Sequence, residues 1–121
     1  MLGNLVPLQQ NLGFSTTETF TGFYWTDGKP IMARVFSFTT NNSQGVTVYN
    51  PSVTADSIIA CWNEFRQTVN GWNYRYVAPT TGMDFITAEI DPGNALVVAS
   101  KHSNDLWNGA SVKCTVLYTK P

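Results

Sequence analysis

The side chains that could carry out acid–base or nucleophilic chemistry are few in this sequence and stand apart from one another. The one histidine, His102, lies in a polar stretch between Lys101 and Ser103. A nucleophile needs a base within hydrogen-bonding reach, and histidine is the usual base, but no nucleophile motif accompanies His102. The eight acidic residues, which would have to pair for glycoside cleavage, are spread along the chain. The sequence therefore predicts a protein that is not an enzyme and has no catalytic residues.

Metal-ligating residues are equally sparse. The two cysteines, Cys61 and Cys114, lie in separate strand-like runs and permit one intrachain bridge at most. In a reducing cytosol we expect free buried thiols rather than a disulfide. Together with His102 they fall short of the four ligands of a structural zinc site, and the oxygen-rich turns lack the ligand spacing of a calcium loop. We expect no metal and no other cofactor.

One segment has the composition of a ligand-binding loop. Residues 103–109 combine an aromatic ring, Trp107, with the amide and acid side chains of Asn104, Asp105 and Asn108. Saccharides stack on flat aromatic rings and are oriented by such polar groups, so this loop is a candidate contact for a glycan or receptor. The alternative is that Trp107 closes one end of the fold, because tryptophan is highly buried on average.

The charge of the chain limits its partners. Its 121 residues carry a net charge of −1, and charged residues make up 12%, about half the usual share of ~25%. The basic residues are scattered singly, so no stripe is available to neutralise nucleic-acid phosphates. No run of about eighteen apolar residues would span a bilayer. We expect one domain that neither binds nucleic acid nor inserts into a membrane.

Short runs of β-branched and aromatic residues, separated by turn residues, predict an all-β fold. The stretch 57–68 also allows a short helix, but its β-branched start and the Asn70-Gly71 turn signal favour a strand. Asp27, Gly28 and Pro30 are expected to form a structural turn. Together these features predict an antiparallel β-sandwich, jelly-roll-like, with about eight short strands at 16–25, 31–39, 46–49, 57–68, 72–77, 85–90, 95–100 and 112–118.

Alternation within two of these strands indicates which side chains share a face. Val112, Cys114, Val116 and Tyr118 recur at every second position of the last strand, which predicts a common face. Trp72, Tyr74 and Tyr76 do the same and are interpreted as core residues or as a candidate subunit interface.

The first thirteen residues read as an arm attached to a domain at 14–121. Pro7 and Gly13 interrupt any period, yet five aliphatic residues lie among them: Leu2, Leu5, Val6, Leu8 and Leu12. Two interpretations stay open: a frayed terminus, or an arm that docks on a neighbouring subunit or another particle protein. In the second case Leu5, Val6 and Leu8 belong to the interface.

Two segments resemble a known family. Residues 14–36, FSTTETFTGFYWTDGKPIMARVF, are similar to the YSTEE-x-x-x-G-x-W-x-DGKPIY-x-(K/R)-x-F stretch of many phage tail-fibre and minor tail proteins. Residues 110–120, ASVKCTVLYTK, are similar to the A-x-V-x-L-x-Y-T-K ending of the same group. Met32 stands where the family usually has tyrosine.

The resemblance implies a β-sandwich module of a bacteriophage virion, usually homotrimeric and often placed to meet the host surface. In that family the tryptophan before the Asp-Gly turn, here Trp25, packs under the hairpin with its neighbour Tyr24. The expected function is that of a small fibre, spike or decoration protein of the tail or capsid, assembled in the host cytoplasm. Its expected partners are copies of itself, other virion proteins through residues 1–13, and a host surface glycan.

Overall fold

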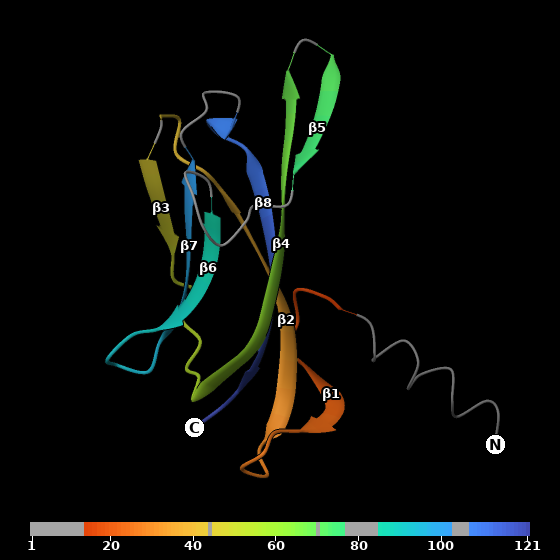
Figure 1. Cartoon of the computed structure of the whole chain (residues 1–121), viewed down its shortest axis with the longest axis vertical. Coiled ribbons are helices and arrows are strands. Elements are labelled where there is room, and N and C mark those ends of the chain that lie inside the picture. The colour runs from red at the N-terminus through yellow and green to blue at the C-terminus, as the bar shows by residue number, and fades with distance from the viewer. Residues whose placement is uncertain (1–13, 44, 70, 77–84, 103–106) are drawn as a thin grey trace, which may run out of the picture.

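The computed structural model describes residues 14–43, 45–69, 71–76, 85–102 and 107–121, without the side chains of Val69, Tyr74, Tyr76 and Phe85. This part of the chain forms eight antiparallel strands (Figure 1). They are β1 (Thr19–Tyr24), β2 (Pro30–Thr39), β3 (Gly45–Tyr49), β4 (Ser57–Val69), β5 (Trp72–Tyr76), β6 (Phe85–Ile90), β7 (Leu96–His102) and β8 (Ser111–Thr119).

The strands divide into two sheets that pack against each other. The larger sheet has the order β1-β2-β8-β4-β5, and the smaller one the order β3-β7-β6. The predicted antiparallel β-sandwich of about eight short strands is therefore confirmed. The ambiguous stretch 57–68 is a strand, because it pairs with β8 on one side and with β5 on the other.

The last strand, β8, lies at the centre of the larger sheet. Val112, Cys114, Val116 and Tyr118 share the face that packs on the smaller sheet and are fully buried, as their alternation predicts. Phe36 and Phe65 from the flanking strands join them, and the opposite sheet contributes residues such as Leu96 and Val98. Burying one such aliphatic or aromatic side chain contributes roughly 1.5–3 kcal/mol, so this layer is the main source of stability.

The predicted turns form by the expected hydrogen bonds. At the β1–β2 turn, Lys29 N donates to Asp27 Oδ1 at 3.0 Å, and Gly28 has φ +85°, which suits glycine. Between β6 and β7, Asn94 N donates to Asp91 O at 2.9 Å. Pro30 begins β2, where a missing N–H costs no ladder bond.

The β4–β5 hairpin extends beyond the rest of the larger sheet. The first residue of β8, Ser111, lies opposite Arg66, so the residues after Arg66 in β4 pair only with β5. Figure 1 shows β5 and the adjoining end of β4 rising above the other strands. The described residues form no helix that is long and apolar enough to cross a membrane.

Candidate functional site

The outward side of the larger sheet carries an unusual number of apolar side chains. Strand alternation places Leu117 of β8, Ala33 of β2 and Ala60 of β4 on the side opposite the core, because they pair with one another across the sheet. Aromatic side chains from β1, β4 and the segment before β1 surround them. We call this set the outer apolar face; it consists of Phe14, Phe20, Phe23, Ile31, Ala33, Trp62 and Leu117.

The outer apolar face is hollowed between β1 and β8. Ile31, Ala33 and Leu117 line a concavity of about 390 Å³ together with Phe14, Phe20 and Phe23. Ile31 and Ala33 are buried, whereas Phe23 is 71% exposed and Phe14 58% exposed. The hollow therefore combines apolar side chains that are already covered with aromatic rings that remain open to solvent.

An irregularity in β1 gives the hollow its shape. Phe20 pairs with Met32 and Tyr24 with Pro30, so three residues of β1 stand opposite Ile31 alone. Gly22, in the middle of the three, has φ +88°, a conformation that other residues rarely adopt. Thr21 Oγ1 donates to the carbonyl oxygen of Ile31 at 2.8 Å and holds the bulged segment in place. Such bulges bend the strand and redirect its side chains, and here Thr21 and Phe23 both line the hollow.

The segment before β1 is held across the same face. Val35 N donates to Ser15 O at 2.8 Å, and Arg34 Nε donates to Thr16 O at 3.0 Å. Phe14 then meets Trp62 of β4 edge to face, with 5.4 Å between ring centroids. The described chain thus begins on the outer apolar face itself.

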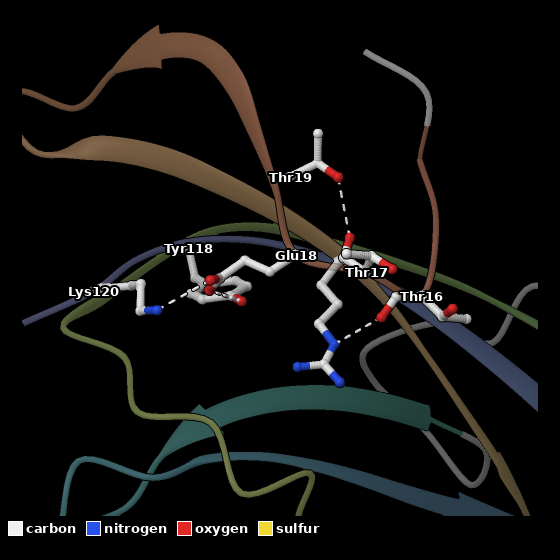
Figure 2. Close-up of polar contacts among 7 residues, drawn as sticks. Thr16, Thr17, Glu18, Thr19, Tyr118 and Lys120 are labelled. Atoms are coloured by element: carbon white, nitrogen blue, oxygen red, sulfur yellow. Dashed lines mark hydrogen bonds and ion pairs between the residues drawn. The ribbon is translucent and has the colours of Figure 1, made fainter. Parts of the chain in front are cut away.

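Glu18 ties this segment to the end of the chain. Its carboxylate accepts a hydrogen bond from Tyr118 Oη at 2.6 Å and pairs with Lys120 Nζ at 3.0 Å, as Figure 2 shows. Burial raises the pKa of Glu18, but the hydrogen bonds from Tyr118 and Lys120 and the charges of Lys120 and Arg34 outweigh it, so the pKa is lowered. Burial and the same carboxylate raise the pKa of Tyr118, so it remains a neutral donor.

The burial of Trp107 decides between the two interpretations of the loop that the sequence leaves open. Trp107 is only 7% exposed and packs on Phe65, with 5.6 Å between ring centroids. Its carbonyl accepts a hydrogen bond from Thr40 Oγ1, which anchors the turn to the end of β2. The structure therefore favours the alternative in which Trp107 closes one end of the sandwich, because a buried ring offers no face for a sugar. Asn104 and Asp105 lie outside the described residues.

The predicted position of His102 in a polar stretch is also corrected by the structure. His102 is not in a polar loop but in the last position of β7, where it pairs with Gly45 and is 1% exposed. Its Nε2 lies 2.8 Å from Oδ1 of Asn108, the fourth residue predicted for the loop. Asn108 is half-buried, and its carbonyl accepts a hydrogen bond from Gln67 Nε2 at 2.7 Å.

The aromatic residues predicted for a subunit interface are only partly described. Trp72 begins β5 and is 71% exposed; the backbones of Tyr74 and Tyr76 follow in the same strand. Leu5, Val6 and Leu8 lie outside the described residues. The predicted packing of Tyr24 and Trp25 under the hairpin is wrong, because they are 63% and 37% exposed. Tyr24 ends the edge strand β1, and Trp25 begins the turn that follows it.

The two cysteines meet across β4 and β8. Both are free thiols, with Sγ atoms 3.1 Å apart, and Cys114 is buried. The hydrogen bond from Cys114 lowers the pKa of Cys61, although burial opposes this, and the pKa of Cys114 is raised. No group of three or more histidine, cysteine or acidic side chains is placed to hold a metal ion within the described ranges.

The outer apolar face was not found from the sequence, although one signal was present. Residues 31–36 of β2 are apolar at almost every position instead of every second one, which is typical of a strand covered on both faces. β1 and residue 14 cover only part of the second face, which leaves the exposed rings of Phe14, Phe23 and Trp62.

Comparisons with known proteins add no relative: no family model, no curated protein and no solved structure matches the chain.

Replacing Trp107 by alanine tests whether this residue packs or presents its ring. We expect Trp107→Ala to lower the free energy of unfolding by about 3–5 kcal/mol, the usual cost of removing a buried aromatic side chain. The matched variant Trp72→Ala removes an exposed ring and should cost at most about 0.5 kcal/mol in the single chain. Urea unfolding of both variants gives the answer, and equal small losses would contradict the packing role.

Glu18→Gln tests the contact between the two ends of the described chain. At pH 7 we expect a loss of about 1–2 kcal/mol in the free energy of unfolding, because the hydrogen bond from Tyr118 no longer ends on a charge. The lowered pKa of Glu18 means that its contribution is complete above its ordinary value of 4.5. The contribution is lost as the pH falls through the lower, folded value.

The difference between wild type and Glu18→Gln should therefore shrink at pH 3, where the native carboxyl is increasingly protonated. Glu89→Gln, a change at an exposed carboxylate, serves as the control. A difference that is the same at pH 7 and pH 3 would show that the charge of Glu18 is not involved.

Proposed function

We propose that this protein is a non-enzymatic structural component of a bacteriophage virion, a small fibre, spike or decoration module of the tail or capsid. Three observations support the proposal: the β-sandwich fold, the resemblance of residues 14–36 and 110–120 to tail-fibre modules, and the outer apolar face. The observation that carries it is the last, because an assembly module must offer a surface that a neighbour covers.

The outer apolar face has the character of a protein–protein interface. Large contiguous apolar patches are rare on monomeric soluble proteins and usually mark interaction sites. Phenylalanine and tryptophan are enriched at interface cores and charged residues are depleted there. The hollow between β1 and β8 is lined by no charged residue and by five large aromatic or aliphatic side chains: Phe14, Phe20, Phe23, Ile31 and Leu117.

The proposed occupant of this face is a second copy of the same chain, in a homotrimer of the kind that the resemblance implies. Phe14 lines the hollow, and the thirteen residues before it carry five aliphatic side chains. The described part of the chain therefore begins, at Phe14, in the lining of the hollow. In the proposed assembly residues 1–13 reach a neighbouring copy or another virion protein and bury their leucines there.

A receptor-binding module that uses Trp107 is the other function that the sequence suggests. That function requires an exposed aromatic loop, and the burial of Trp107 removes this support. In this proposal the protein is assembled into the virion in the host cytoplasm and then remains on the particle.

Phe23→Ser tests the proposed interface in solution. The wild-type chain should have a mass near three times 13.4 kDa by light scattering, whereas Phe23→Ser should shift the mass toward that of one chain. An exposed ring contributes nothing to the fold of one chain, but burying it in an assembly contributes roughly 1.5–3 kcal/mol per copy. Cutting residues 1–13 should shift the mass in the same direction.

Val48→Ser is the matched control, because Val48 is 64% exposed on β3, in the other sheet. It should leave the mass of the assembly unchanged. A wild-type protein with the mass of one chain at all concentrations, or equal behaviour of the Phe23 and Val48 variants, would sink the proposed use of this face.

A further inference from the structure

A second feature lies on the same side of the larger sheet, on the protruding β4–β5 hairpin. Arg66 of β4 stands directly opposite Arg75 of β5. Side chains that face each other across antiparallel strands have Cβ atoms only about 4.5–5.5 Å apart, and like charges in this position are destabilising. The chain has only seven lysines and arginines in all. With so few basic residues, two of them could easily be kept apart, so their placement opposite each other calls for an explanation.

The neighbouring charges balance only one of the two arginines. Arg66 Nε donates to Glu64 Oε1, and Glu64 itself stands opposite Lys113 of β8. Arg75 has no ion pair with any described residue. Among the described residues, this end of the outward face thus holds three cations and one carboxylate, so it is locally positive in a chain with a net charge of −1.

The two arginines border a shallow hollow that also offers neutral polar groups. Its lining consists of Arg66, Gln67, Thr68, Asn73 and Arg75, and its volume is about 200 Å³. Thr68 Oγ1 donates to Asn73 Oδ1 at 2.8 Å, so the amide nitrogen of Asn73 is left to donate elsewhere. The side chain of Gln67 is held in place by the hydrogen bond that its Nε2 donates to the carbonyl oxygen of Asn108. The hollow therefore places neutral polar groups beside two guanidinium groups.

We propose that this hollow binds the carboxylate of an acidic saccharide, a hexuronic acid residue of a surface polysaccharide. A guanidinium carries five N–H donors in a planar fork that matches a carboxylate, and the ion pair with Glu64 uses only the Nε donor of Arg66. A carboxylate between Arg66 and Arg75 would relieve their repulsion. Thr68 and Asn73 would meet the sugar hydroxyl groups. A nucleic acid would need a longer basic stripe than this isolated pair.

The binding test is a titration with a glucuronic acid disaccharide, followed by the amide and guanidinium NMR signals of the protein. We expect shifts centred on Arg66, Asn73 and Arg75. The corresponding neutral glucose disaccharide should bind at least about tenfold more weakly, because the charge-assisted hydrogen bonds are lost. Inorganic phosphate is the second comparison: binding as tight as that of the uronate would overturn the saccharide assignment.

Two matched variants separate this site from general attraction between charges. Arg75→Gln should weaken uronate binding about tenfold, whereas Lys113→Gln, the same charge change on the same face, should leave it nearly unchanged. In the absence of ligand at low salt, Arg75→Gln should raise the midpoint of thermal unfolding, because it removes the repulsion, and Lys113→Gln should not. Equal weakening by both variants, or no shift at Arg66 and Arg75 with the uronate, would overturn the proposal. Neither variant alters the outer apolar face, so the outcome is independent of the assembly test.

Discussion

The central position of β8 is the constraint on which the rest of the structure depends. This strand is paired along its whole length with β4 on one edge and, except at Thr119, with β2 on the other. Its inward residues, Val112, Cys114, Val116 and Tyr118, form the middle of the core. Because successive side chains of a strand point to opposite faces, this placement also puts Thr115 and Leu117 on the outward side. The inner core and the outward surface are thus two consequences of one register.

The outward side of the larger sheet is divided into two regions of different chemistry. Near β1 it is apolar and hollowed, and around the β4–β5 hairpin it carries Lys113, Glu64, Arg66 and Arg75. An apolar region exposed to water costs solubility unless a partner covers it, whereas opposed arginines cost stability unless an anion joins them. Both regions are therefore unfavourable in the isolated chain. A second copy of the chain would cover the apolar region, and an acidic saccharide would neutralise the two arginines. In the assembly that we propose, the first region contacts a neighbouring subunit and the second stays open to its ligand.

Features that depend on neighbouring residues along the chain could be predicted from the sequence. The alternation of β8 predicted its buried face, and Asp27 and Gly28 predicted the first turn. The Asn70-Gly71 signal and the β-branched residues correctly favoured a strand for residues 57–68. In each case the deciding interaction lies within a few residues, or follows from the two-residue period of a strand.

Features that depend on contacts between distant segments could not be predicted in this way. The polar neighbours of Trp107 along the chain are also those of an exposed loop residue. In the structure Trp107 is buried by contacts with Phe65 and Thr40, which are more than forty residues away. His102 has polar neighbours along the chain, yet pairing with β3 places it inside the sandwich. Arg66 and Arg75 lie opposite each other only once the register of the hairpin is known. The hollow under Phe23 likewise depends on the bulge at Gly22 and on the pairing of β1 with β2.

The most direct test of the assembly role is whether the outer apolar face loses contact with water as the protein associates. The methyl groups of Leu117 and Val48 can be compared by NMR in the presence of a soluble paramagnetic agent over a range of protein concentrations. If copies of the chain cover this face, the relaxation effect at Leu117 falls as concentration rises while that at Val48 stays constant. If Leu117 remains equally accessible at the highest concentration, the outer apolar face is not a contact between copies of this chain.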